Sequence, residues 1–248
     1  MAFGGIIRFS DILKTANSHP EFKKGCVVDT SILFAASYTP DFFNKESEEL
    51  FEYLAELEIP LFTNINIRSE FMNKQRQVMI PEGLSDLYTS FGKSLDVVLY
   101  SKLQSNYTTV SEGRKTGKSY KLDENQIKSW RKLLRVRQLK TNDGWIQFCS
   151  DYLKGKIETV WDKACDEFGI NFLSLRDDDK PNWLTGDMNW DGMAQIIGQY
   201  GIASSDAMII NLFLNSHFPA IITADGEIAY VVEKIAPLNK FVIIPDKL

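Results

Sequence analysis

The sequence predicts an α/β fold with a central, mainly parallel sheet and a mostly helical insertion. Two observations support this. Short apolar runs rich in β-branched residues alternate with helix-like segments in the first third of the chain, and the same alternation returns near its end. Residues 82–200 lack it. A length of 248 residues, 44% of them hydrophobic, suits one domain carrying a long insertion.

The N-terminal elements follow from the pattern of apolar residues. Residues 1–25 are expected to form a short helical lead-in, with Ser10 capping a helix that reaches about Asn17. The run 26–34 is almost continuously apolar and contains one acid, Asp29. Its length and its β-branched residues favour a buried central strand that ends near Asp29.

A second strand and two helices complete the first βαβα pattern. Residues 48–57 place apolar side chains at helical spacing and glutamates on the other side. Residues 59–63 predict a strand, because a proline is tolerated near a strand's start. A helix is expected from about Asn66 to Val78, and the pattern breaks at the Pro-Glu-Gly segment 81–83.

The alternation resumes near the C-terminus. Residues 207–214 predict a helix that is apolar nearly all round and therefore buried. A strand at 219–223, a helix at 227–235 and a strand at 241–244 follow. We therefore expect one domain over 1–248, with a sheet core from about 26–80 and 201–248 and an insertion at 82–200.

Composition narrows the function classes. A net charge of −5 argues against wholesale wrapping of nucleic acid but allows a local basic surface. Cys26, Cys149 and Cys165 form no CxxC pair, so a structural zinc site is not expected, and their low number suits a reducing compartment. We find no apolar run of about 18 residues and no signal-peptide pattern, so a cytoplasmic protein without membrane association is expected.

Four acids fall at the predicted carboxyl edge of the sheet, where ligands bind in open parallel α/β folds. Asp29 closes the first strand and Asp225 follows the strand at 219–223. Asp206 opens the buried helix, and Glu70 lies one turn into the helix after the second strand. These positions predict that the four carboxylates meet in space.

Each acid also has an ordinary explanation. Asp206 is favourable at the positive end of its helix, Asp225 and the following glycine are a common turn pair, and Glu70 fits a solvated helix face. Asp29 is the hardest to explain in this way, because a carboxylate inside an apolar strand is costly unless it is paired or bound to metal.

Four carboxylates repel one another if they are desolvated and unpaired. A divalent cation bound between them would remove this repulsion. Mg²⁺ and Mn²⁺ prefer oxygen ligands and retain waters, which suits a phosphodiester substrate. One or two such ions activate a water and stabilise the leaving oxygen in an in-line displacement. This chemistry needs no histidine, and His19 and His217 are expected to be structural or surface residues.

Four segments of this chain resemble the acidic motifs of the PIN-domain family. They are Val27–Ser31, Arg68–Phe71, Gly201–Ile209 and Ile222–Glu227. Their order, their strand or helix context and their chemistry all agree with the family pattern. The first and third segments are the more specific, and the second is weak by itself. The resemblance covers about 26–80 and 200–248, roughly half of the chain.

The resemblance implies a PIN-like, Rossmann-like three-layer fold, dependence on Mg²⁺ or Mn²⁺, and endoribonuclease activity. Carried over residue by residue, the catalytic and metal-binding acids are Asp29, Glu70, Asp206 and Asp225. The supporting residues are Ser31 and Thr223, through hydrogen bonds, and Glu227, which stands where many members have a further acid. Many small members are toxins neutralised by a partner protein, but this chain departs from them in the size of its insertion.

A basic segment within the insertion is the candidate nucleic-acid contact. Residues 111–140 hold ten Lys or Arg against three Asp or Glu, a surplus of seven positive charges, and the rest of the chain carries −12. Such asymmetry suggests a phosphate-binding arm. Trp130 either stacks on a base or anchors the core, and the segment is otherwise a solvated basic helix. The residues expected on one helix side are Lys128, Arg131, Lys132 and Arg135.

Two further segments carry weaker signals. Residues 113–119 suggest a phosphate-binding loop, but the glycines are separated by three residues where that motif has four, so a flexible basic loop is expected instead. The acidic, turn-rich stretch 176–192 is expected to be mostly solvated, with one acid near the metal site or the whole stretch acting as a lid.

The leading hypothesis is a cytoplasmic, metal-dependent endoribonuclease that hydrolyses RNA phosphodiester bonds, in a toxin-like or an RNA-processing role. One alternative is a non-catalytic PIN-like module that binds RNA or protein. Another is a DNA-directed nuclease, because nothing in the sequence reads the 2′-hydroxyl. The expected partners are RNA, either single-stranded or structured, with an antitoxin or inhibitor protein and a second copy of the chain left open.

Overall fold

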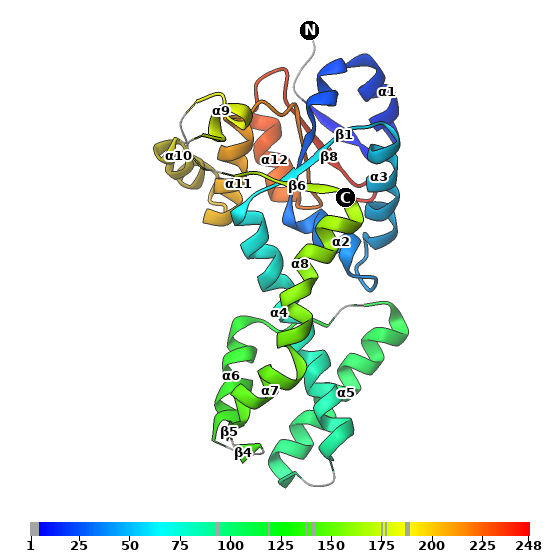
Figure 1. The fold of residues 1–248 in the computed structure, drawn as a ribbon, viewed down its shortest axis with the longest axis vertical. Coiled ribbons are helices and arrows are strands. Elements are labelled where there is room, and N and C mark those ends of the chain that lie inside the picture. The colour runs from blue at the N-terminus through cyan, green and yellow to red at the C-terminus, as the bar shows by residue number, and fades with distance from the viewer. Residues whose placement is uncertain are drawn as a thin grey trace. The chain divides into compact units, whose positions relative to one another are not determined.

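A computed structural model describes residues 5–92, 95–118, 120–136, 138–139, 142–174, 176, 178–186 and 189–248 (Figure 1). The predicted α/β class is confirmed, because six strands of the described residues form one sheet in which every pairing is parallel. The chain divides into two compact units. The sheet unit comprises Met1–Thr39, Phe43–Phe71 and Ala164–Leu248, and the helical unit comprises Pro40–Phe42 and Met72–Lys163.

The strand order of the main sheet is β1-β8-β7-β2-β3-β6, which places β2 and β7 at its centre. Their six residues are fully buried, as the predicted central strands require. A separate antiparallel pair, β4 and β5, belongs to the helical unit. The strands are β1 Ile6–Arg8, β2 Cys26–Val28, β3 Leu61–Thr63, β4 Gln138–Leu139, β5 Asn142–Asp143, β6 Ile170–Phe172, β7 Ala220–Ile222 and β8 Phe241–Ile244.

Both outer strands of the sheet differ from expectation. β1 lies in the predicted helical lead-in, and Ser10 donates to Asp246 instead of capping a helix. β6 lies in the predicted insertion and pairs with β3. Ile6 of β1 is 42% exposed, and Phe172 of β6 is 45% exposed. Edge strands are paired and packed on fewer sides, so the hydrophobic signal that identifies a central strand is absent from them.

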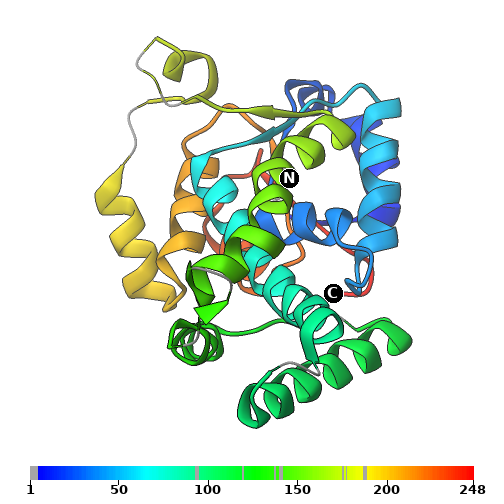
Figure 2. The same cartoon turned by 60° about the horizontal axis from the view of Figure 1, so that its bottom comes forward.

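Helices cover both faces of the sheet. Val27, Ile221 and Val242 belong to one apolar cluster with residues of α11 and α12, while α1 and α3 lie on the opposite side (Figures 1 and 2). The helices of the sheet unit are α1 Ile12–Ser18, α2 Thr30–Ser37, α3 Asn44–Glu56, α9 Lys180–Trp183, α10 Trp190–Tyr200, α11 Ser204–Leu214 and α12 Gly226–Ile235, and two short 3-10 helices span Phe9–Asp11 and Pro20–Lys24. The predicted helices and strands of the C-terminal part are confirmed.

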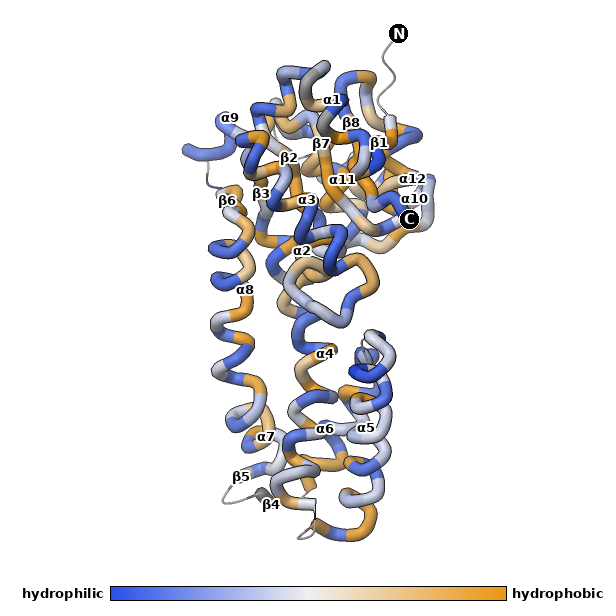
Figure 3. Tube along the Cα trace, turned by 90° about the vertical axis from the view of Figure 1, so that its right-hand side faces the viewer, coloured by the Kyte–Doolittle hydropathy of each residue, from blue (hydrophilic) through white to orange (hydrophobic). Residues whose placement is uncertain are grey.

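Two long helices run from one unit into the other, and three more helices belong to the helical unit. In Figure 3 apolar and polar stretches alternate along α4 and α8, as expected of helices with one buried side. None of the described helices is both long enough and apolar enough to span a bilayer. The connecting helices are α4 Ile65–Phe91 and α8 Lys154–Phe168, and the others are α5 Val97–Thr116, α6 Glu124–Arg135 and α7 Gly144–Tyr152.

The predicted break at Pro81 is wrong, because α4 continues through it to Phe91. A proline inside a helix removes the N–H that would reach the carbonyl four residues earlier. Here that carbonyl, on Gln77, accepts from the backbone N–H of Leu122 at 3.1 Å. The Pro81 carbonyl accepts from Asn106 Nδ2 at 2.8 Å. The bond from Leu122 to Gln77 therefore replaces the one that the proline removes.

The boundary between the units also differs from the expected insertion at 82–200. The helical unit runs from Met72 to Lys163, and α10 and β6 belong to the sheet unit. The helical unit has a core of its own, which includes Ile80, Leu103 and Phe148. Because these side chains are fully buried within this unit, the segment is a compact body rather than an extended loop.

Lys240 anchors the C-terminal end of α11. Its ammonium donates to the carbonyl oxygens of Phe213, Ser216 and Phe218 at 2.7–2.8 Å. The side chain is 6% exposed, and burial lowers the pKa of Lys240 to about 8. Cations are favourable beside the last carbonyls of a helix, so this lysine satisfies three buried acceptors at once.

Replacing Lys240 with methionine should destabilise the protein strongly. Lys240→Met keeps the side-chain length but leaves three buried carbonyls without their donor, so the free energy of unfolding should fall by about 2–4 kcal/mol. Equilibrium unfolding in urea measures this. Lys14→Met, at an exposed position of α1, should stay within about 0.5 kcal/mol of the parent. Equal stabilities for the two variants would contradict the anchoring role.

Candidate functional site

The predicted acids lie at the carboxyl edge of the central strands. β2 and β7 are parallel neighbours with Val28 opposite Ile222. After β2 the chain passes to β3 on one side, and β7 returns on the other. The order of the strands therefore reverses between β2 and β7, which is the point where open α/β sheets bind ligands. Asp29 follows β2 at this edge, and Asp225 follows β7 after two residues.

Asp29 is held rigidly by its neighbours. It is 2% exposed and caps the N-terminus of α2. One carboxylate oxygen, Oδ2, accepts from Ser31 N at 3.1 Å, Ser31 Oγ at 2.5 Å and Thr223 Oγ1 at 2.9 Å. Within the described residues no hydrogen bond reaches the other oxygen, Oδ1. The buried acid is thus oriented through one oxygen and keeps the second available.

Ser31 and Thr223 connect the two central strand ends. Their hydroxyl oxygens lie 3.2 Å apart. Ala224 N donates to Ser31 Oγ at 2.8 Å, and Asp225 N donates to Thr223 Oγ1 at 2.9 Å. The two predicted supporting residues therefore join the turn after β2 to the turn after β7. This network fixes the backbone that carries Asp29 and Asp225.

Asp225 and Glu70 reach the same region from different helices. Asp225 caps α12, with Oδ1 accepting from Glu227 N at 2.8 Å and Ile228 N at 3.3 Å. Glu70 lies on α4, where its Oε2 accepts from Thr30 Oγ1 at 3.2 Å. Thr30 is fully buried and was not predicted as a site residue. The position of Thr30 between Asp29 and Ser31 could have indicated a role in the site. Its contact with Glu70 could not be predicted, because this contact depends on the packing of α2 against α4.

Asp206 is affected by the charges of the other three acids. It lies in the first turn of α11 and is half-buried. Burial, and then the negative charges of Glu70, Asp225 and Asp29, raise the pKa of Asp206 to about 6. The charges of all three other predicted acids therefore act on this carboxyl. Four segments that are widely separated in the sequence bring their carboxylates within electrostatic reach of one another.

The amino ends of three helices meet the acids. Asp29 and Asp225 are the N-caps of α2 and α12, and Asp206 is in the first turn of α11. The positive end of a helix dipole stabilises a nearby carboxylate by about 0.3–1 kcal/mol. The helices therefore offset part of the mutual repulsion, but they do not neutralise four charges.

The acids are near one another without forming a ready ligand set. Among the residues that the structure describes, no group of three or more Asp, Glu, His or Cys side chains is placed to hold a metal ion. The donor chemistry still fits a hard cation, because every side chain of the cluster offers oxygen. Asp29 also has one oxygen outside its hydrogen-bond network. Asp206 is bonded to Ser205 Oγ at 3.3 Å, a weak restraint on its rotation.

Glu227 does not join the cluster through its side chain. Its backbone N–H donates to Asp225, but the residue is exposed, and no hydrogen bond or ion pair of its carboxylate occurs among the described residues. Asp178 and Asp191 of the acidic stretch are exposed as well. Neither contributes to the pKa shift of Asp206. Asp177 and Asp187, which belong to the same prediction, lie outside the described residues.

The predicted basic side of α6 divides into two pairs. Arg131 lies over the ring of Trp145 at 5.6 Å, and Arg135 pairs with Asp143 at 3.5 Å. These arginines thus contact residues at the start of α7. Lys128 and Lys132 are exposed and form no ion pair with any described residue. The two lysines remain available for phosphate, whereas the two arginines also support the helical unit.

The segment 113–119 is a helix end rather than a phosphate-binding loop. α5 continues to Thr116, and Gly117 ends it with a left-handed φ of 66°. Lys118 N then donates to Gly113 O at 2.9 Å. A Cβ on Gly113 would lie 2.7 Å from the Lys118 carbonyl oxygen. The two glycines therefore serve the helix terminus, and the prediction of a flexible loop is wrong for residues 113–117. Ser119 lies outside the described residues.

Comparisons with known proteins find no relatives. No protein-family model, no curated protein and no solved structure matches this chain.

Proposed function

We propose that this chain is a metal-dependent endoribonuclease of the PIN type, with Asp29, Glu70, Asp206 and Asp225 as the ligands of Mg²⁺ or Mn²⁺. The observation that carries the proposal is the place of Asp29 and Asp225 at the two central strand ends where the strand order reverses. Hydrogen bonds through Ser31 and Thr223 join these two ends. The charges of Glu70, Asp225 and Asp29 also act on Asp206, which supports a shared site at the edge of the sheet where ligands bind. The PIN-type assignment itself rests on the sequence resemblance.

The repulsion between the four carboxylates favours the binding of a cation. Four carboxylates in a half-buried site repel one another, which raises the free energy of the metal-free fold. A hard divalent cation with oxygen ligands turns that repulsion into attraction. Asp29, fixed through Oδ2, is suited to bind through Oδ1. Asp206 and Glu70 would turn toward the ion, since the metal-free arrangement has no formed ligand set.

The residues of the cluster would divide the chemical work. A bound cation supplies an activated water and stabilises charge on the phosphodiester. Ser31 and Thr223 hold Asp29 in place, so its contribution is preorganised orientation. Asp206 would help to hold the cation from the first turn of α11, because the charge of a bound cation favours the ionised carboxylate.

Lys128 and Lys132 are the proposed phosphate contacts of the helical unit. Both are exposed cations on one side of α6, and each phosphate contact releases counterions when a strand binds. Cations of this kind do not distinguish RNA from DNA. The preference for RNA rests on the family resemblance, so a DNA-directed nuclease is tested beside it.

A non-catalytic binding module is the second candidate. One observation favours it, namely that no group of described residues is already arranged to hold a metal ion. In that case the polar network around Asp29 would be structural, and Lys128 and Lys132 would bind a strand that the protein never cuts. Metal binding and cleavage therefore have to be measured separately.

The wild-type protein should cut single-stranded RNA in Mn²⁺ and lose this activity when EDTA removes the ion. The assay follows cleavage of matched RNA and DNA oligonucleotides by the full chain, and calorimetry follows Mn²⁺ binding. Asp166→Asn, at an exposed position of α8, is the matched control and should cut like the parent. Cleavage of DNA alone would support the DNA-directed alternative. Mn²⁺ binding without cleavage would support the binding module, and neither binding nor cleavage would overturn the metal proposal.

A further inference from the structure

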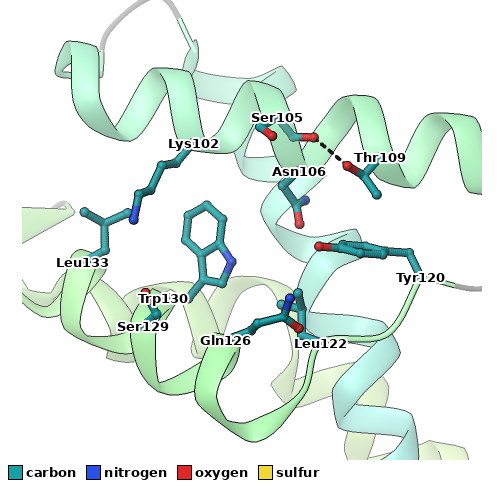
Figure 4. Close-up of a pocket in the computed structure, with 10 residues that line it drawn as sticks. All are labelled: Lys102, Ser105, Asn106, Thr109, Tyr120, Leu122, Gln126, Ser129, Trp130 and Leu133. Atoms are coloured by element: carbon teal, nitrogen blue, oxygen red, sulfur yellow. Dashed lines mark hydrogen bonds between the residues drawn. The ribbon is translucent and has the colours of Figure 1, made fainter.

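A second site candidate lies wholly within the helical unit. A cavity of about 230 Å³ opens between α5, α6 and the segment 120–122 (Figure 4). Its walls combine an indole ring, a phenol ring, an amide and an ammonium group. They come from Trp130, Tyr120, Asn106 and Lys102. The acids of the sheet unit are not part of it.

Asn106 presents a fixed hydrogen-bond acceptor to this cavity. The residue is 5% exposed. Its amide nitrogen donates to Pro81 O at 2.8 Å and to Ser85 Oγ at 3.1 Å. Because a backbone carbonyl can only accept, these bonds determine which end of the amide is nitrogen. The oxygen Oδ1 is buried and has no hydrogen-bond partner among the described residues.

A buried carbonyl oxygen without a donor is costly, at about 1–3 kcal/mol, and native structures contain few of them. Figure 4 shows the Asn106 oxygen directed toward the space beside Tyr120 and Trp130. A ligand that fits here must therefore bring an N–H or O–H donor to this point. A purely apolar ligand or an anion would leave the oxygen unsatisfied.

The aromatic walls require that the ligand be flat. Trp130 lies between Lys102 and Asn106 in Figure 4, and Tyr120 lies beside Asn106. The volume is below the roughly 300–1,000 Å³ of pockets for drug-sized molecules, so one planar ring system fits rather than a whole nucleotide. Lys102 is exposed and forms no ion pair with a described residue. Its ammonium is suited to a phosphate outside the cavity.

We infer that this cavity binds one unstacked nucleobase carrying an exocyclic amino group, such as adenine, within a single-stranded RNA. The amino group donates to Asn106 Oδ1, the base stacks on Trp130, and Lys102 contacts the adjacent phosphate. The choice of RNA as the strand rests on the proposed nuclease function. The need for a flat ring with a donor rests on the cavity alone.

Binding of short oligonucleotides to the full chain in EDTA tests this inference without cleavage. Fluorescence anisotropy compares oligoadenylate with the same oligomer built from purine riboside, which lacks only the amino group. Oligoadenylate should bind at least about fivefold more tightly, as one lost hydrogen bond to a buried acceptor implies. Oligouridylate, which presents a carbonyl at the corresponding position, should bind more weakly than oligoadenylate.

Trp130→Leu should weaken the binding of oligoadenylate by about 5- to 100-fold, the loss expected for one base–aromatic stack. It should also remove the difference between adenine and purine riboside. Trp190→Leu, at a 59% exposed tryptophan of the sheet unit, is the matched control and should bind like the parent. Circular dichroism and thermal unfolding check that both variants are folded.

Equal affinity of the wild-type protein for adenine and purine riboside oligomers would overturn the inference, whatever happens to the Trp130 variant. Unchanged binding by a folded Trp130→Leu protein would overturn it as well, and the cavity would then hold only water. These results are independent of the nuclease proposal. RNA cleavage together with equal affinity for the two oligomers refutes the pocket alone, and base-selective binding without cleavage refutes the nuclease alone.

Discussion

Asp29→Asn should lower Mn²⁺-dependent cleavage of RNA by at least about 1,000-fold. The expected loss corresponds to about 4 kcal/mol, within the several kcal/mol that a correctly held cation contributes to transition-state charge stabilisation. Asparagine keeps the shape of the side chain, and its amide oxygen can still accept from Ser31 and Thr223. The substitution therefore removes the charge from Asp29 and leaves the network with an acceptor.

Initial rates at saturating Mn²⁺ measure this effect, and near-ultraviolet circular dichroism reports whether the fold is intact. Asp166→Asn serves again as the control for the loss of one aspartate charge. A folded Asp29→Asn protein that cuts RNA at the parental rate would exclude Asp29 as a metal ligand. It would also remove the central acid of the proposed site.

Asp206→Asn should abolish cleavage to a similar extent while stabilising the metal-free protein. A raised pKa means that the folded state binds the proton of Asp206 more tightly than the unfolded chain does. The metal-free protein therefore loses stability as pH rises from about 4 through about 6. At pH 8 the variant lacks this penalty, and it should gain about 1 kcal/mol after allowance for solvent screening of a half-buried group.

Mn²⁺ should stabilise the wild-type protein much more than the Asp206→Asn variant. An ion at about 100 times its dissociation constant stabilises the wild-type fold by about 2.7 kcal/mol, and Asp206→Asn should lose most of this gain. Urea unfolding with and without Mn²⁺ measures both quantities. A variant that is less stable than the parent in EDTA, or that is stabilised by Mn²⁺ as much as the parent, contradicts the proposed cluster.

Some elements of the fold could be predicted from local sequence patterns, and others depend on tertiary packing. The central strands and the helices α11 and α12 were predictable, because each is buried on most sides and its apolar residues repeat with its own period. The edge strands β1 and β6 were not, since apolar residues in them, Ile6 and Phe172, are exposed and give no buried-strand pattern. The continuation of α4 through Pro81 was not predictable either, because the carbonyl of Gln77 is satisfied by Leu122 from another segment.

The candidate site divides in the same way. Asp29, Asp206 and Asp225 stand out in the sequence because each follows a strand or opens a helix, and Ser31 and Thr223 are beside them in the chain. The hydrogen bond from Thr30 to Glu70 and the orphan oxygen of Asn106 exist only after packing. Neither has a sequence signature, since the residues involved are ordinary and the partners lie in other segments.

The sequence by itself determined the α/β class, the positions of the central strands and the acids at their ends. These depend on the character of short segments, whose hydrophobic period and caps can be read locally. Tertiary structure alone decided where the sheet ends, where the helical unit begins, which acids act on Asp206 and which polar atom of the helical unit lacks a partner. These features depend on which segments, distant in the sequence, pack against each other. The local pattern of one segment does not indicate which other segment it will contact.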